Sequence, residues 1–166
     1  GEILVRGGNV FDGYFDDDAA TAQSLQEGWL HTGDAGHLED DGQLVVLGRI
    51  SEVVYTNARQ RFIPTFIENQ LKFSPYIKDV CVLGDGRDGL AALVAIDWEA
   101  VGHWAQEHGV AYTSFSDLSQ QVGVYDVMAE LMASVNAKLP EGTRIHRFVN
   151  LHKEFDPDDG EVTRTC

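Results

Sequence analysis

Residues 28–34 read Gly-Trp-Leu-His-Thr-Gly-Asp, and residues 48–52 read Gly-Arg-Ile-Ser-Glu. The intervening residues 35–47 are two short runs on either side of an Asp-Asp-Gly turn, which is the pattern of a β-hairpin. A hairpin returns the chain on itself, so the sequence predicts that Asp34 and Arg49 lie near each other at its open end.

Asp34 and Arg49 are a candidate binding pair because of their chemistry. A carboxylate can accept hydrogen bonds from two neighbouring hydroxyl groups, such as those of a ribose, and a guanidinium can add a charge-assisted contact. Thr-Gly-Asp is also a common turn, and an Asp–Arg pair across a hairpin is more often structural. The local pattern therefore leaves a ribose site and a structural ion pair both open.

Composition limits the classes of function. The chain has 166 residues, enough for one domain or for one domain and part of another, and its formal net charge is −15. A nucleic-acid-binding protein needs a basic face to neutralise phosphates, so we expect no nucleic-acid partner. No run approaches the ~20 apolar residues of a membrane-spanning helix. The chain starts without methionine inside a predicted strand, so we expect it to be a piece of a longer protein.

The histidines and cysteines do not form an obvious ligand set. His103 and His108 have no cysteine or acid at a spacing that would complete a metal site, so we predict no metal site in the chain. Cys81 lies in an apolar run that we predict to be a buried strand, and Cys81 and Cys166 do not make a disulfide framework. A reducing compartment is the simpler expectation.

The hydrophobic pattern predicts an α+β fold. Before the hairpin we expect a strand over residues 1–6 and a short helix capped by Asp18. After it, the expected elements are strands over 52–56 and 61–63, a helix over 64–73, strands over 78–84 and 90–97, a helix over 98–108, a polar connection over 110–121, a helix over 124–139 and a strand over 145–151. Together these give a central sheet with helices packed on one face.

Several motifs occur in an order that is specific although each one is degenerate. They are Glu2-Ile3-Leu4-Val5-Arg6-Gly7, Gly13-Tyr14, Thr21-Ala22, Gly28-Trp29-Leu30-His31-Thr32-Gly33-Asp34, Gly42, Gly48-Arg49 and Pro64-Thr65-Phe66-Ile67-Glu68. In this order they resemble the C-terminal part of the acyl-adenylate-forming (AMP-binding) enzymes, which include acyl-CoA synthetases, luciferases and peptide-synthetase adenylation domains. Residues 67–77 and 156–165 further resemble the long-chain fatty acyl-CoA synthetases, and the match spans essentially the whole chain.

The resemblance implies a division of the chain. Residues 1–48 would be the end of a large N-terminal region, and residues 52–166 a small mobile C-terminal domain. Residues 49–51, which are Arg49, Ile50 and Ser51, would be the hinge about which this domain rotates between adenylation and thioester formation. Many relatives carry Asp or Lys at the position of Ser51.

The resemblance also implies site residues. Asp34 and Arg49 would contact the ribose of ATP. Arg59 and Arg61 are either contacts for the phosphates of CoA or solvated surface residues, and both interpretations stay open, since the turn before Arg61 lacks the glycine that relatives usually carry. The family's catalytic lysine is expected just after Cys166, so we predict no catalytic residue within this chain.

We therefore expect the parent protein to be a fatty acid–CoA ligase that uses ATP and CoA through an acyl-AMP intermediate. The acyl pocket, the phosphate loop and any ligands of the Mg²⁺ that accompanies ATP are expected upstream, in the N-terminal region that would be the chain's partner. The chain alone is expected to be inactive. We expect the parent in the cytoplasm, with peripheral membrane contact left open. Two alternatives remain: an adenylating enzyme with another acceptor, as in acyl-AMP ligases and carrier-protein loading, and a non-catalytic binding module.

Overall fold

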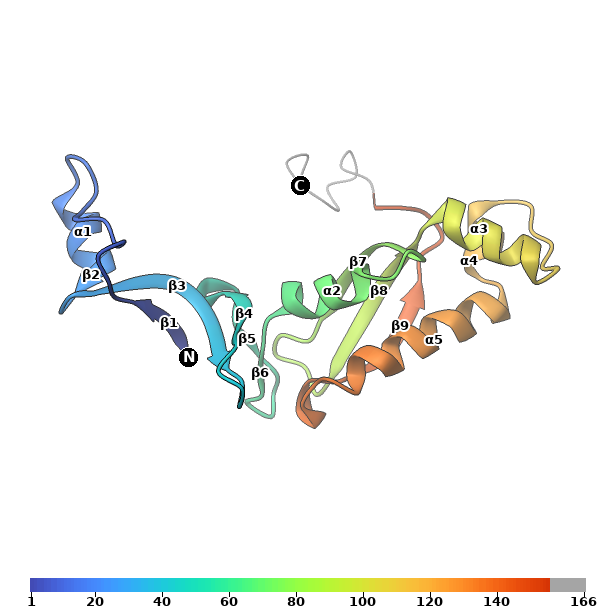
Figure 1. The fold of residues 1–166 in the computed structure, drawn as a ribbon. Helices are drawn as coiled ribbons and strands as arrows, with labels where there is room; N and C mark the ends of the chain where they lie inside the picture. Colours follow the sequence, from blue (N-terminus) through green and yellow to red (C-terminus); the bar gives the residue numbers. More distant parts are fainter. Residues whose placement is uncertain (156–166) are drawn as a thin grey trace. The chain divides into compact units, whose positions relative to one another are not determined.

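The computed structural model describes residues 1–155, which fall into two compact units (Figure 1). Unit 1 is Gly1–Val53, and unit 2 is Val54–Cys166, of which the structure describes residues 54–155. The division comes just after Arg49, Ile50 and Ser51. The role of these three residues as a hinge stays a prediction.

Unit 1 is an antiparallel sheet built around one long strand, β3 (Trp29–Leu38). β1 (Glu2–Val5) pairs with one edge of β3, and β2 (Leu25–Gln26) and β4 (Leu44–Arg49) pair with the other. β3 and β4 form the predicted hairpin. A short 3₁₀ helix, η1 (Ile50–Glu52), follows it.

The helix α1 (Asp18–Ser24) precedes β2 and is capped by Asp17, not by Asp18 as the sequence suggested. Asp17 has a non-helical backbone (φ −139°, ψ 80°), and its carboxylate accepts a hydrogen bond of 2.8 Å from the backbone N–H of Ala20. This is the usual geometry of an N-cap residue, whereas Asp18 is already the first helical residue. The prediction was wrong by one position because three aspartates in a row offered three candidate caps.

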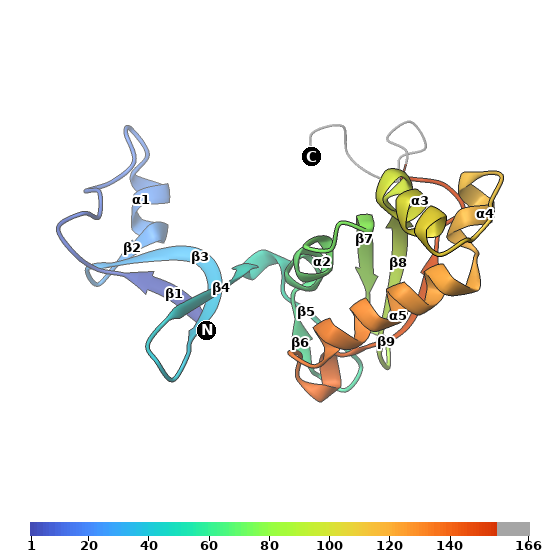
Figure 2. The ribbon, with the colours of Figure 1, turned by 45° about the vertical axis from the view of Figure 1, so that its right-hand side comes forward.

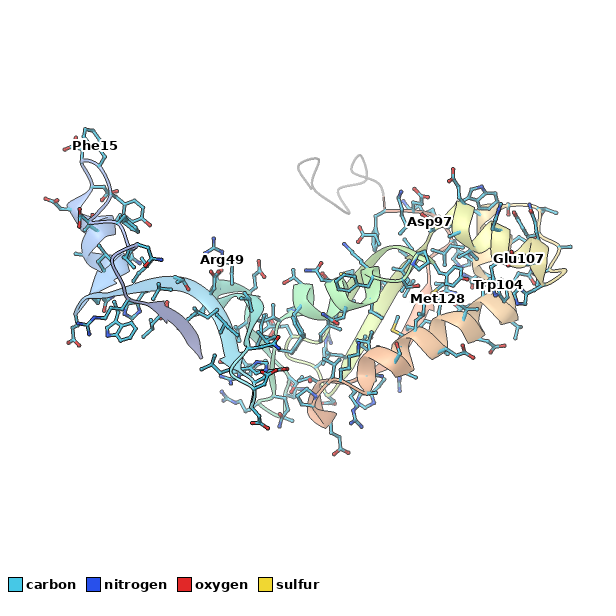
Figure 3. The ribbon with its side chains drawn as sticks, in the orientation of Figure 1. Phe15, Arg49, Asp97, Trp104, Glu107 and Met128 are labelled. Carbon is cyan, nitrogen blue, oxygen red and sulfur yellow. The ribbon has the colours of Figure 1, made fainter. Side chains whose placement is uncertain are left out.

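Unit 1 has almost no core. Ala35 and Gly36 are its only buried residues, and Phe15, at the tip of the loop before α1, is fully exposed (Figure 3). Large apolar side chains on the hairpin, such as Leu38 and Val46, are more than half exposed. A sheet that buries so little apolar surface cannot offset the conformational entropy of its own chain.

Unit 2 is an α+β domain with a mixed three-stranded sheet in the order β7-β8-β9. β7 (Ile77–Leu83) and β8 (Leu90–Ile96) are antiparallel, while β9 (Ile145–Asn150) is parallel to β8. A parallel pair requires a crossover connection, and here it consists of α3 (Trp98–Glu107), α4 (Phe115–Ser119), α5 (Val122–Asn136) and the 3₁₀ helix η2 (Glu141–Thr143). A small hairpin of β5 (Val54–Tyr55) and β6 (Arg61–Phe62) precedes α2 (Pro64–Lys72).

The core of unit 2 lies between the sheet and its helices. α2 and α5 run across one face of the sheet (Figure 2), as the sequence predicted. The buried cluster is drawn wholly from unit 2. It includes Ile67 and Leu71 from α2, Val80 and Val82 from β7, Ala92 and Val94 from β8, and Val124, Met128, Met132 and Val135 from α5.

Two expectations about unit 2 were wrong. The predicted strand over residues 52–56 is shorter, because the chain first makes the turn of η1, where the N–H of Val53 donates to the carbonyl of Ile50 (3.1 Å). The predicted connection over residues 110–121 contains the helix α4. Ser114 caps it by accepting a hydrogen bond from the N–H of Asp117 (3.1 Å).

Because the buried core lies in unit 2, we predict that unit 2 folds by itself and that unit 1 does not. Residues 54–155 expressed alone should unfold in urea as one cooperative transition, because their core lies within that segment. Residues 1–53 expressed alone should show no transition and no dispersed NMR spectrum. A cooperative transition in the shorter segment, or its absence in the longer one, would contradict this account.

Candidate functional site

Asp34 and Arg49 face each other across the β3–β4 hairpin, as the sequence predicted. Their Cα atoms are register partners, and Arg49 Nη1 lies 3.2 Å from Asp34 Oδ1. The Arg49 side chain is 62% exposed and that of Asp34 is 36% exposed, so both can be reached from solvent. An ion pair this exposed adds little stability.

Asp34 is displaced from the regular ladder by a bulge on β3. Leu4 pairs with His31, and Glu2 pairs with Ala35, so that residues 32–34 of β3 face the single residue Ile3 of β1. We call residues 32–34 the Thr-Gly-Asp bulge. Gly33 at its centre has φ +71°, a left-handed conformation that costs glycine little. A bulge re-aims side chains and removes ladder hydrogen bonds locally.

The hydroxyl of Thr32 replaces some of the backbone hydrogen bonds that the bulge removes from the ladder. It donates a hydrogen bond of 2.8 Å to the carbonyl of Ile3 on β1, and it accepts one of 3.1 Å from the backbone N–H of Asp34. The carbonyl of Thr32 accepts a further hydrogen bond of 3.2 Å from Arg49 Nη1. The same guanidinium nitrogen therefore contacts both ends of the bulge.

Glu2 also holds the bulge, and the sequence analysis did not single it out as a site residue. Its Oε1 accepts a hydrogen bond of 3.1 Å from the N–H of Gly33, and its Oε2 lies 2.9 Å from Nδ1 of His31. Since an ionised carboxylate only accepts, Nδ1 of His31 carries the proton. The hydrogen bond from His31 lowers the pKa of the Glu2 carboxyl; partial burial opposes this effect, and the Gly33 N–H adds to it.

Gly36 fixes the register of the hairpin below the bulge. A Cβ atom at this position would lie 2.6 Å from the carbonyl oxygen of Val45 and 2.9 Å from Cδ1 of Ile3. Both contacts are closer than real Cβ atoms tolerate, so only glycine allows β1 and β4 to approach β3 here. The pairing of Asp34 with Arg49 depends on that approach.

Arg59 and Arg61 lie in and after the turn between β5 and β6, within unit 2, and both are exposed. The turn is closed by Thr56, whose N–H donates to the carbonyl of Gln60 (3.0 Å). Arg59 has φ +61°, so it adopts without glycine the left-handed conformation that glycine adopts most readily. Both guanidinium groups face solvent, which leaves open the two interpretations given above.

The remaining candidate groups are accounted for within residues 1–155. No group of three or more His, Cys, Asp or Glu side chains in this range could hold a metal ion, and no helix in it is long and apolar enough to cross a membrane. Cys81 is half-buried on β7. Burial raises the pKa of its thiol, with Glu68 and Asp79 adding to the shift, so the thiol is a poor nucleophile. Residues 156–166, after which the lysine is expected, lie outside the described residues.

Comparisons of the sequence with known proteins identify the family of the chain. The AMP-binding enzyme C-terminal domain matches residues 51–156. A long-chain-fatty-acid–CoA ligase of Mycobacterium tuberculosis (FadD15) is 37% identical over 99% of this chain, and human long-chain-fatty-acid–CoA ligase 1 is 34% identical over the same share. The chain covers 28% and 24% of these two proteins, so it spans about a quarter of the length of the curated relatives it matches.

Solved structures show the same fold. The adenylation domain of a carboxylate reductase from Mycobacterium chelonae superposes on 98% of this chain with a TM-score of 0.64 at 21% identity, and the chain covers 24% of it. The O-succinylbenzoate–CoA synthetase of Bacillus subtilis, solved with AMP, superposes on 99% of the chain with a TM-score of 0.55 at 25% identity, and the chain covers 29% of it. The chain belongs to the AMP-binding enzymes and is the C-terminal part of such an enzyme.

Proposed function

We propose that the full-length protein containing this chain is an ATP-dependent ligase that converts a long-chain fatty acid to acyl-AMP and transfers the acyl group to CoA. The printed names of the relatives in M. tuberculosis and human support the substrate class. The observation that carries the proposal is the Asp34 carboxylate, which lies in the Thr-Gly-Asp bulge opposite β1 and beside Arg49 on β4.

Asp34 suits the ribose of ATP. Its Oδ1 contacts Arg49, and an ionised carboxylate has enough lone pairs to accept hydrogen bonds from both hydroxyls of a ribose as well. Arg49 places a positive charge against the carboxylate and can add a charge-assisted contact to a ligand bound there. The groups that bind the triphosphate, its Mg²⁺ and the fatty acid belong to the part of the protein outside this chain. The chain alone is therefore proposed to be inactive.

Arg59 and Arg61 are proposed to contact the phosphates of CoA. With a net charge of −15 the chain repels anionic ligands at long range, so local cations are needed where CoA approaches. Lys72, the other cation near this part of the sequence, is already paired with Asp79. The two exposed arginines of the β5–β6 turn are the better candidates.

A second candidate function differs only in the acyl acceptor. The β5–β6 turn has no glycine, and the Cβ of Arg59 lies where a glycine would give a ligand's arm closer access to the backbone. This departure from the usual turn keeps an acceptor other than free CoA as the second candidate. We further propose a cytoplasmic location, in keeping with the free thiol of Cys81, and peripheral contact of the full-length protein with a membrane.

The proposed reaction predicts fatty-acid-dependent exchange between pyrophosphate and ATP by the full-length protein, followed by thioester formation when CoA is added. Exchange without thioester would favour the other acceptor, and a purified acyl carrier protein would then be tested in place of CoA. Absence of exchange with medium- and long-chain acids alike would contradict the ligase proposal.

The ribose contact predicts that Asp34→Asn in the full-length protein raises KM for ATP by about tenfold or more, because a hydrogen bond to a charged group contributes about 1.5–3 kcal/mol. With 2′,3′-dideoxy-ATP, which lacks both hydroxyls, the variant and the unsubstituted protein should have the same KM. Asp40→Asn, at the tip of the same hairpin, is the matched control. An unchanged KM for ATP in Asp34→Asn would remove this residue from the site.

The hinge proposal predicts that Ser51→Pro impairs one half-reaction more than the other. Proline fixes φ and restricts the preceding residue, Ile50, so the η1 turn loses backbone freedom. The adenylation half-reaction is measured by pyrophosphate exchange. The thioester-forming half-reaction is measured with preformed acyl-AMP and CoA. Ser51→Ala is the control, and equal losses in both half-reactions would count against a hinge here.

A further inference from the structure

Glu2 occupies a position from which it can control the Thr-Gly-Asp bulge without touching the nucleotide. It lies at the start of β1, and its two carboxylate oxygens reach two different points on β3. One is His31, the last residue paired with β1 before the bulge, and the other is Gly33, at the centre of the bulge. Glu2 therefore spans the segment whose shape determines where Asp34 points.

We propose that Glu2, oriented by His31, is a positioning residue that holds the Thr-Gly-Asp bulge in the shape that presents Asp34 to the ribose of ATP. This inference rests on the ribose contact proposed above for Asp34. It assigns to Glu2 a role in nucleotide binding that acts through the backbone of Gly33.

The bulge needs side-chain hydrogen bonds because it lacks some of the backbone hydrogen bonds that a regular pairing with β1 would give it. Residues 32–34 face a single residue of β1, so their backbone groups cannot all pair with that strand. Gly33 has no side chain to restrict its conformation, and its φ of +71° is one of several that glycine adopts easily. The hydrogen bond from its N–H to Glu2 Oε1 therefore favours this conformation, together with the contacts of Thr32 and Arg49 at the two ends of the bulge.

The contact suits this role because each oxygen of the carboxylate has its own partner on β3. The side chains of Glu2 and His31 are 28% and 31% exposed, and the hydrogen bond between them lies at the surface. The lowered pKa of Glu2 agrees with an ionised carboxylate that is bound in the folded state. An ionised acceptor makes shorter and stronger hydrogen bonds than a neutral one.

Glu2 acts on the bulge from the side opposite to Arg49. Arg49, on β4, binds the carbonyl of Thr32 and the carboxylate of Asp34, while Glu2, on β1, binds the N–H of Gly33 between them. Without Glu2, the Gly33 peptide is released and the bulge samples other shapes. The apparent affinity for ATP then falls by the fraction of time spent in the competent shape.

The test is Glu2→Ala in the full-length protein. KM for ATP should rise by about three- to tenfold, less than in Asp34→Asn, because Glu2 acts on ATP only through the population of the competent bulge. kcat and the KM values for the fatty acid and CoA should stay unchanged, and the effect should vanish with 2′,3′-dideoxy-ATP. Glu2→Gln keeps an acceptor for Gly33 and should give an intermediate KM for ATP. Glu39→Ala, an exposed carboxylate at the far end of the same hairpin, is the control.

The possible results separate this inference from the ribose proposal. If Asp34→Asn raises KM for ATP while Glu2→Ala and Glu2→Gln leave it unchanged, the positioning role of Glu2 is overturned and the ribose contact stands. A fall in kcat with unchanged KM for ATP would also overturn it, since this is the result of a merely structural role. If Glu2→Ala does not fold, the KM of Glu2→Gln decides. If Asp34→Asn itself leaves KM unchanged, the ribose proposal fails first.

Discussion

The candidate site depends on an irregularity in a β-sheet, in which three residues of β3 lie opposite one residue of β1. A regular ladder would direct alternate side chains to opposite faces and would consume every backbone group in pairing. The bulge instead takes Asp34 out of the pairing with β1 while it stays paired with Arg49 on β4. Backbone groups of the bulge bond to the side chains of Glu2, Thr32 and Arg49. Glycine is required on both sides of Asp34: Gly33 allows the left-handed turn, and Gly36 allows the neighbouring strands to approach.

The apolar core and the candidate binding residues Asp34 and Arg49 lie in different units. Unit 2 has a mixed sheet, a continuous apolar core and helices that cover it, whereas unit 1 has the Asp34–Arg49 pair on a sheet with almost no core. A sheet of this kind needs apolar surface from outside itself to be stable. In the C-terminal part of an AMP-binding enzyme such an arrangement is reasonable, because this chain covers only about a quarter of its relatives.

The sequence predicted the parts of the site that depend on local signals. The Asp-Asp-Gly turn predicts the hairpin that brings Asp34 near Arg49, and a one-residue shift between Ala35 and Gly36 makes the two residues direct partners. It did not predict the bulge, because the bulge is defined by the pairing of β3 with β1, whose residues are about thirty positions away in the chain. The role of Glu2 was missed for the same reason. Within unit 2 the main helices and strands followed from periodicity, whereas α4 was missed although its cap, Ser114 followed by Asp117, is a local signal.

The measurement that tests the central claim most directly is a crystal structure of the full-length protein with AMP bound. The account predicts that the Asp34 carboxylate lies within hydrogen-bond distance of the ribose hydroxyls, that Arg49 lies beside it, and that Gly33 keeps its left-handed φ with its N–H on Glu2. A ribose bound by other residues, with Asp34 engaged only by Arg49, would contradict the account and make the Asp34–Arg49 pair a structural ion pair.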